Sequence, residues 1–128
     1  MAPSSAYSIM AVDDEEELAV LFKTFLEKSG YGAICFTDPI KALEHFGKYH
    51  DKVHLIITDL KMPKLNGIEF ANKVREYRKT VKILLITAFV VNDLLQDNDF
   101  KRAEIAEILQ KPLHLMKLGS KIDDILIL

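Results

Sequence analysis

The sequence is poor in several residue types, and each shortage excludes a class of protein. It has no tryptophan. Because it has a single cysteine, Cys35, no disulfide can form within the chain, and we expect Cys35 to be a small apolar residue of a strand. The net charge is only −2, so no broad basic surface argues for direct nucleic-acid binding. Residues 1–6 lack the basic start and apolar stretch typical of a signal peptide. The longest apolar run, residues 83–91 with Thr87 inside it, is far short of the roughly 20 residues that span a bilayer. We therefore expect a cytoplasmic protein without membrane segments.

What the chain does contain is an alternation of short apolar runs with amphipathic stretches. The predicted strands are residues 7–12, 33–36, 53–58, 82–87 and 108–110. The predicted helices are residues 18–26, a segment starting at Asp38-Pro39, residues 68–77, a charged stretch from 93 to about 103, and a last helix from 115 that Gly119-Ser120 interrupts. Ser29-Gly30 is the predicted end of the first helix.

The two clearest strands, 53–58 and 82–87, hold apolar runs that do not alternate with polar residues. Such runs are typical of strands covered on both faces, as in a parallel sheet. Strands that alternate with helices then predict a doubly wound α/β domain. In open sheets of this kind the functional site lies beyond the carboxyl ends of the strands.

Four of these strand ends carry complementary chemistry: Asp13 and Asp14, then Asp59, Thr87 and Lys111. Each alone has an ordinary explanation, such as a helix-capping aspartate, a strand threonine or a solvated lysine. Their coincidence at one edge of a sheet predicts a site. Three close carboxylates require shifted pKa values or a cation, and an all-oxygen cluster suits Mg²⁺. A cation, an ammonium and a hydroxyl together suit phosphoryl transfer.

At these residues the chain resembles the receiver domains of two-component response regulators, over essentially its whole length. The resemblance rests on Val12-Asp13-Asp14-Glu15, on Asp59-Leu60-Lys61-Met62-Pro63 with Asn66-Gly67, on Thr87-Ala88 and on Lys111-Pro112. It implies one receiver domain over residues 1–128, with a folded core at about 7–126. It further implies a flavodoxin-like, five-stranded parallel sheet of order 2-1-3-4-5 with helices on both faces.

The resemblance also implies roles at the acidic positions. Asp59 is expected to accept a phosphoryl group from a phosphohistidine of a sensor histidine kinase or phosphotransfer protein. Asp14 and Asp59 are expected to bind Mg²⁺ with the main-chain carbonyl of Lys61, and Asp13 lies close by or acts through water. The domain is expected to be a switch with self-phosphorylation and dephosphorylation chemistry only, and otherwise not an enzyme.

At the other two positions the resemblance implies contacts to the phosphoryl oxygens. Thr87 is expected to hydrogen-bond one oxygen and Lys111 to pair with another, with a cis bond before Pro112. In most receivers an aromatic residue three positions before the lysine turns inward when the threonine moves. Here that position is Ile108, so signal transmission by this rotamer switch is in doubt.

Two further departures concern dephosphorylation and output. Lys61 and Phe89 occupy positions that influence water attack on the acyl phosphate in this family, and their side chains predict slow self-dephosphorylation. The charge-rich stretch 90–106 predicts an atypical partner on a surface that commonly carries output.

The chain ends in the apolar residues 125–128. We therefore expect the last turn to be covered, either by a homodimer through the last helices or by further sequence.

Two other functions stay open from the residues alone. A degenerate receiver would act only as a protein-binding module. This function stays open because Ile108 replaces the aromatic residue of the usual switch. A phosphatase with a phosphoaspartate intermediate would usually carry a second aspartate two residues after Asp59, where this chain has Lys61, which cannot act as a general acid at neutral pH.

Overall fold

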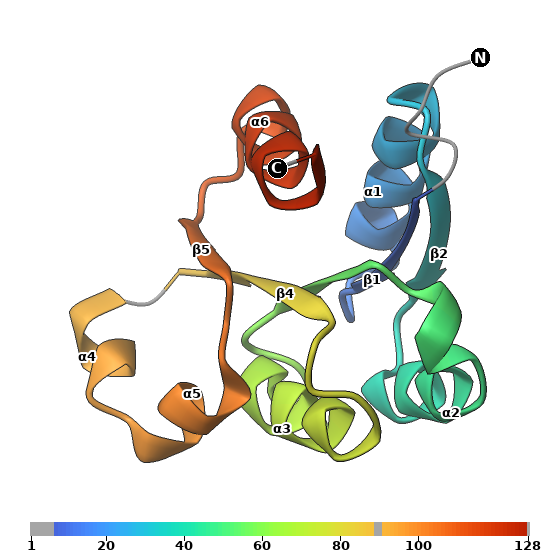
Figure 1. The fold of residues 1–128 in the computed structure, drawn as a ribbon. Helices are drawn as coiled ribbons and strands as arrows, with labels where there is room; N and C mark the ends of the chain where they lie inside the picture. The colour runs from blue at the N-terminus through green and yellow to red at the C-terminus, as the bar shows by residue number, and fades with distance from the viewer. Residues whose placement is uncertain (1–6, 89–90, 128) are drawn as a thin grey trace.

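Five parallel strands form one sheet in the order β2-β1-β3-β4-β5. The computed structural model describes residues 7–88 and 91–127. The strands are β1 Ser8–Val12, β2 Gly32–Phe36, β3 Leu55–Asp59, β4 Lys82–Thr87 and β5 Glu107–Gln110. This arrangement (Figure 1) confirms the predicted doubly wound, flavodoxin-like sheet.

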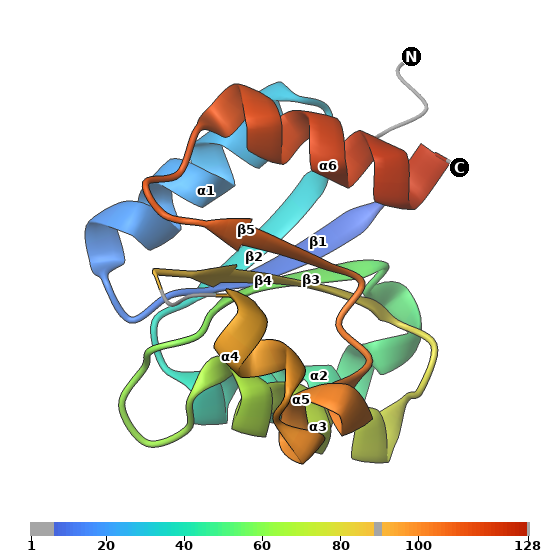
Figure 2. The same ribbon diagram turned by 90° about the vertical axis from the view of Figure 1, so that its left-hand side faces the viewer.

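The helices lie in two layers, one on each face of the sheet (Figure 2). One layer contains α1 (Glu16–Lys28) and α6 (Leu115–Ile127). The other contains α2 (Pro39–Tyr49), α3 (Gly67–Tyr77), α4 (Val91–Leu95) and α5 (Asn98–Ala103), and a 3-10 turn η2 (His50–Lys52) follows α2.

The apolar runs in the central strands are buried on both sides because each face of the sheet carries a helix layer. Along β3, Leu55 and Ile57 pack in the cluster under α1 and α6, whereas Ile56 packs in the cluster under α2 and α3. All three side chains are at most 1% exposed. Full burial of such a side chain stabilises the fold by about 1.5–3 kcal/mol, so the central strands contribute strongly to the stability of the sheet whose carboxyl edge carries the site residues.

Local signals at two helix ends act as predicted. The Asp38 carboxylate accepts the backbone N–H of Ile40 at 2.9 Å and caps α2, whose first residue is Pro39. Gly30 has a φ of 93°, a left-handed conformation that follows the end of α1.

The single helix predicted from 93 to about 103 is wrong: the chain forms α4 and α5 instead. The Asp97 side chain accepts the N–H of Asp99 at 2.8 Å and so starts a second helix. Leu94 and Phe100 are both buried in the same apolar cluster. On one continuous helix, residues six apart would point about 120° away from each other, so the break lets both side chains reach the sheet.

The predicted interruption at Gly119-Ser120 is also wrong, because α6 continues through both residues. A Cβ at Gly119 would lie 3.1 Å from Cζ of Phe25, so the glycine allows α6 to pack closely on α1. Leu118 and Ile122 are fully buried beside it. Their burial outweighs the roughly 1 kcal/mol that glycine costs inside a helix.

The apolar C-terminal turn is partly covered by the chain itself. Ile125 and Leu126 are half-buried and pack against the cluster under α1 and α6. The homodimer through the last helices therefore stays a prediction. Within residues 7–88 and 91–127, no helix has the length and apolar character needed to cross a membrane.

Candidate functional site

The carboxyl ends of β1, β3 and β4 bring three predicted site residues together. Val12 is in register with Thr58, so Asp13 emerges beside Asp59 at the end of β3. Asp59 is in register with Ile86, and Thr87 follows directly as the last residue of β4. Parallel pairing thus converts distant sequence positions into neighbours at one edge of the sheet.

The three aspartates form one cluster. Carboxylate oxygens of Asp13, Asp14 and Asp59 lie within 4.8 Å of one another. Asp13 is 2% exposed and Asp59 is 5% exposed, whereas Asp14 faces solvent. An oxygen of Asp13 also accepts the N–H of Glu15 at 2.9 Å. Glu15 is the N-cap residue of α1 and makes no side-chain cap hydrogen bond, so the explanation of Asp13 as a helix cap is wrong.

The electrostatics of Asp13 show that the cluster suits a cation. Burial raises the pKa of Asp13 from 3.8 to about 6; the Glu15 N–H opposes this rise, and the negative charges of Asp59 and Asp14 add to it. The ionised form of Asp13 is therefore disfavoured unless positive charge lies beside it. A partly open, all-oxygen donor set fits a hard divalent ion such as Mg²⁺.

Lys111 supplies one positive charge to the cluster. Its Nζ donates a hydrogen bond to Oδ2 of Asp59 at 3.0 Å, and its side chain is 31% exposed. Burial lowers the pKa of Lys111, but the hydrogen bond and charge of Asp59 outweigh burial, so the pKa is raised overall. The alternative of a purely solvated lysine is wrong. The bond from Lys111 to Pro112 is cis, as expected.

Thr87 is buried at the end of β4, and its backbone fixes the lysine. The Thr87 carbonyl oxygen accepts the N–H of Lys111 at 2.8 Å, so the threonine and the lysine occupy one local frame. Thr87 is only 1% exposed.

Two residues position Asp59 in a way that the sequence does not predict, although one of them, Gly67, belongs to the motif that carries the resemblance. A Cβ at Gly67 would lie 2.4 Å from the carbonyl oxygen of Asp59, so only glycine allows α3 to start this close to β3. The buried Thr58 hydroxyl donates to the same carbonyl oxygen at 3.0 Å. The approach of Gly67 depends on tertiary placement because it joins the start of α3 to the end of β3, whereas the Thr58 contact is local, between neighbouring residues.

Three residues at which the sequence departs from the usual receiver pattern lie in different surroundings or outside the described part of the chain. Lys61 is exposed in the loop after β3. Ile108 is half-buried on β5 and packs against the cluster that contains Leu85 and Phe100. Phe89 lies outside the described residues.

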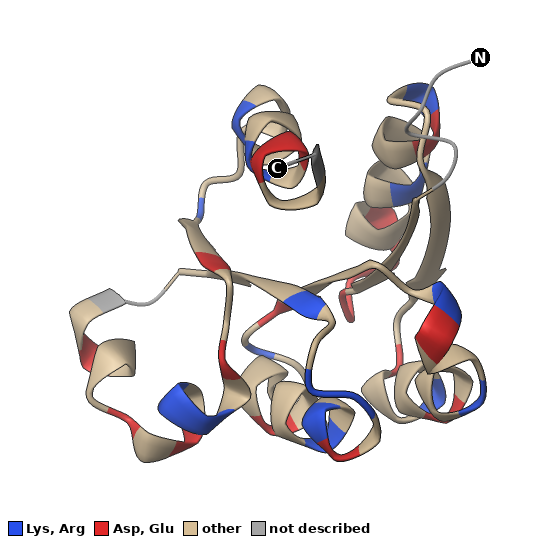
Figure 3. Ribbon diagram, viewed as in Figure 1, with Lys and Arg blue, Asp and Glu red and all other residues tan. Residues whose placement is uncertain are grey.

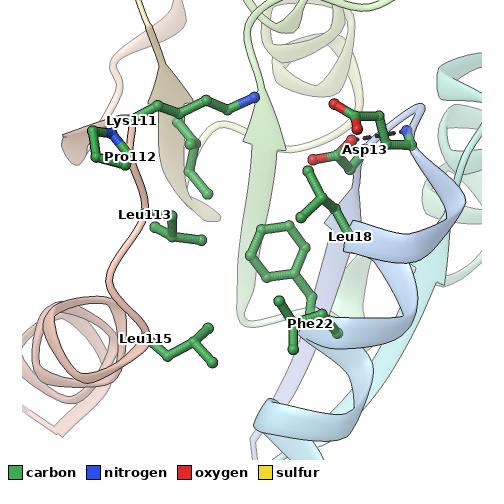
Figure 4. A pocket seen from close by; sticks show the side chains of 10 residues that line it. Asp13, Leu18, Phe22, Lys111, Pro112, Leu113 and Leu115 are labelled. Atoms are coloured by element: carbon green, nitrogen blue, oxygen red, sulfur yellow. Dashed lines mark hydrogen bonds between the residues drawn. The ribbon is translucent and has the colours of Figure 1, made fainter.

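An apolar cavity of about 320 Å³ adjoins the carboxylates. Figure 4 shows Leu18 and Phe22 of α1 facing Leu113, which follows β5, and Leu115, the first residue of α6, with Asp13 at one end. The ammonium of Lys111 points toward the acidic end of this cavity. The site is therefore a charged cluster with an apolar wall on the α1 side.

Comparison with known proteins gives one consistent result. The response regulator receiver domain family matches residues 9–123. Over 119 residues the chain is 35% identical to the response regulator receiver protein CpdR of Brucella abortus, covering 93% of this chain and 95% of CpdR.

A longer relative and a solved structure give the same match. The chain is 39% identical over 80 residues to the alkaline phosphatase synthesis transcriptional regulatory protein PhoP of Bacillus subtilis, covering 62% of this chain but 32% of PhoP. The response regulator TrrA of Thermotoga maritima, solved in complex with Mg²⁺-BeF, superposes with a TM-score of 0.79 at 28% identity, covering 94% of this chain and 99% of TrrA.

Proposed function

This chain belongs to the response regulator receiver domain family, and we propose that Asp59 is its phosphoacceptor. In this proposal, phosphorylation of Asp59 switches the domain between two signalling states of a two-component system. The folded core that we propose, residues 7–126, includes the family match at 9–123.

The observation that carries the proposal is the 3.0 Å contact between Lys111 and Asp59 inside a cluster of three carboxylates. A structural ion pair would need one carboxylate, whereas this lysine faces an excess of two negative charges. Such an excess of acid at the carboxyl edge of a parallel sheet favours a site for a cation and a phosphoryl group.

The chemistry we propose for Asp59 follows from its surroundings. One oxygen of Asp59 receives a hydrogen bond from Lys111, and its other oxygen attacks the phosphorus of a phosphohistidine. A P–O bond forms as the P–N bond breaks, and the imidazole leaves. Lys111 then pairs with a phosphoryl oxygen, and the Thr87 hydroxyl hydrogen-bonds another.

We propose that Asp13, Asp14 and Asp59, with the main-chain carbonyl of Lys61, hold Mg²⁺. When bound, Mg²⁺ neutralises negative charge on the carboxylates and on the phosphoryl oxygens. The raised pKa of Asp13 and the all-oxygen donors support this assignment. TrrA, a relative by structure, was solved with Mg²⁺-BeF.

The proposed donor is a sensor histidine kinase or a phosphotransfer protein, because these are the proteins with which receiver domains interact. We propose no catalytic activity beyond gain and loss of the phosphoryl group. Lys61 supports this limit, since the position two residues after Asp59 holds an ammonium and not the acid that a phosphatase would use.

One experiment tests the acceptor. The chain is incubated with acetyl phosphate or a phosphoramidate, with and without Mg²⁺, and its intact mass is measured. A gain of one phosphoryl group that requires Mg²⁺ is expected for the wild type and for the control Asp124→Asn, an exposed change on α6. No gain is expected for Asp59→Asn.

The other outcomes point to the competing functions. If the folded wild type gains no mass with either donor, the chain is a degenerate receiver that acts as a binding module. If phosphate esters are turned over continuously, it is a phosphatase.

A further inference from the structure

The segment that joins the acceptor strand β3 to α3 is a loop of residues 60–66. The next residue, Gly67, donates its N–H to the Leu60 carbonyl oxygen at 2.7 Å, so the two ends of the loop are held together. Met62 is 8% exposed and packs in the apolar cluster under α2 and α3. These contacts fix the base of the loop, whereas Lys64, further along, is exposed.

Lys64 has a left-handed backbone conformation, with a φ of 72°. Residues other than glycine seldom adopt this conformation because their Cβ crowds the backbone, so the surrounding contacts must hold it. The neighbouring residues form a tight turn, in which the N–H of Leu65 donates to the carbonyl oxygen of Pro63 at 2.8 Å. A contact that holds the Lys64 side chain therefore helps to fix the path of the loop.

The Lys64 side chain is held by Asp38, on the segment that follows β2. Nζ of Lys64 donates to Oδ2 of Asp38 at 3.0 Å. The other oxygen of Asp38 accepts the N–H of Ile40 at 2.9 Å and caps α2, so the carboxylate has a fixed direction. The hydrogen bond from Lys64 is the main reason why the pKa of Asp38 lies below its ordinary value.

This ion pair spans the end of the strand that leads to Asp13. In the parallel sheet β1 lies between β2 and β3, so the segments that follow β2 and β3 lie on either side of the carboxyl end of β1. The carbonyl oxygen of Phe36, at the end of β2, accepts the N–H of Asp13 at 3.0 Å. The loop after Asp59 is thus tied through Asp38 to the segment that also holds the backbone of Asp13.

The pair is a specific local contact and not part of a surface of one charge. Figure 3 shows both charge colours on α2 and on α3, the helices that follow the two joined segments. Lys23 and Glu27 form an ordinary pair within one helix, four residues apart. Lys64 and Asp38 are 26 residues apart and join two loops, so their contact restrains the tertiary structure at the carboxyl edge.

We propose that Lys64 is a positioning residue: paired with Asp38, it holds the loop after Asp59 in the conformation that presents the main-chain carbonyl of Lys61 to Mg²⁺. This inference rests on the proposed function, in which that carbonyl is a metal ligand. Lys61 lies in the loop three residues before Lys64, so a change in the path of the loop moves its carbonyl. Mg²⁺ requires nearly ideal octahedral geometry, and displacement of one ligand therefore lowers its affinity.

Positioning and simple electrostatics predict opposite effects of removing the Lys64 ammonium. A nearby positive charge repels a cation, so loss of that charge alone would strengthen Mg²⁺ binding. If Lys64 positions the carbonyl, its loss weakens Mg²⁺ binding in spite of the lost repulsion. Loss of the Asp38 charge weakens binding in both cases, so Lys64 is the decisive residue.

The test is a Mg²⁺ titration of the nitrogen-15-labelled full chain without any phosphodonor, followed by the amide shifts of Asp13, Asp14 and Asp59. Lys64→Met, which keeps an unbranched side chain without the charge, is expected to raise the Kd for Mg²⁺ about twofold to fivefold, the range for an exposed ion pair. Asp38→Asn, which can still cap α2, is expected to raise it by a similar factor. The double variant should bind no more weakly than Asp38→Asn alone, because both changes remove the same contact.

Two further variants serve as controls. Lys64→Arg keeps the positive charge and is expected to bind Mg²⁺ as the wild type does. Lys23→Met breaks an exposed ion pair within α1 and is expected to leave the Kd unchanged. Circular dichroism of each variant establishes that it is folded.

Three results overturn the positioning role while the wild type still responds to Mg²⁺. Lys64→Met binds the ion as tightly as the wild type or more tightly; Lys64→Arg binds as weakly as Lys64→Met; or Lys23→Met weakens binding to the same extent. If the wild-type amides do not respond to Mg²⁺ at all, the proposed metal site itself is refuted, and the positioning role with it.

Discussion

The substitution Asp13→Asn is expected to stabilise the metal-free protein. Burial raises the pKa of Asp13 from 3.8 to about 6, so the ionised form is less favourable in the fold than in the unfolded chain. Each pKa unit corresponds to about 1.4 kcal/mol, so two units set an upper value of about 3 kcal/mol. Asparagine removes the charge, and its side-chain oxygen can still accept the N–H of Glu15. We expect a gain of about 1–3 kcal/mol near neutral pH.

The sign of the pH dependence follows from the raised pKa. The stability associated with Asp13 is fully present below pH 3.8, where the carboxyl is protonated in both states, and is lost as the pH rises through about 6. The gain from Asp13→Asn should therefore shrink as the pH falls from 6 toward 3.8. Added Mg²⁺ should stabilise the wild type more than the variant.

The measurement is urea unfolding with a chelator at about pH 7.5, followed by far-ultraviolet circular dichroism because the chain has no tryptophan. Asp124→Asn, an exposed change on α6, is the control and should alter the free energy of unfolding by no more than about 0.5 kcal/mol. A variant of Asp13 that is less stable than the wild type under these conditions would refute the assigned electrostatics.

Three further predictions follow from single contacts. Gly67→Ala should cost about 1–3 kcal/mol in unfolding free energy and slow phosphorylation by acetyl phosphate, because its Cβ would lie 2.4 Å from a backbone oxygen of the acceptor. Gly32→Ala, whose Cβ meets its nearest atom at 3.5 Å, is the control, and equal losses would contradict the explanation. The phosphorylated domain should lose its phosphoryl group slowly, and faster in Lys61→Ala; intact mass after donor removal measures this, and loss within seconds in the wild type would exclude shielding. Tyr31→Phe should lower the unfolding free energy by about 1–3 kcal/mol, because the buried hydroxyl donates to a carboxylate of α6, whereas Tyr77→Phe, half exposed, should change little in the same assay.

The strands and the placement of the candidate site residues at one sheet edge were predictable from the sequence for a common reason. Apolar runs such as 82–87 indicate burial on both faces, and residues that follow such strands must lie at one edge of the sheet. Asp13, Asp59, Thr87 and Lys111 were therefore predictable without coordinates. The sequence did not predict the break between α4 and α5, because burial of both Leu94 and Phe100 depends on the shape of the sheet beneath them.

By itself, the sequence determined the layer order, the edge at which the site lies and the residue types that meet there, since these depend on periodicity and on local order along the chain. Tertiary structure alone decided the contacts across the fold. The backbone approach of Gly67 to Asp59 and the packing of Gly119 on Phe25 each join segments that sequence spacing leaves unrelated. Close packing decides such contacts, because the space left by every neighbouring element determines whether a side chain fits.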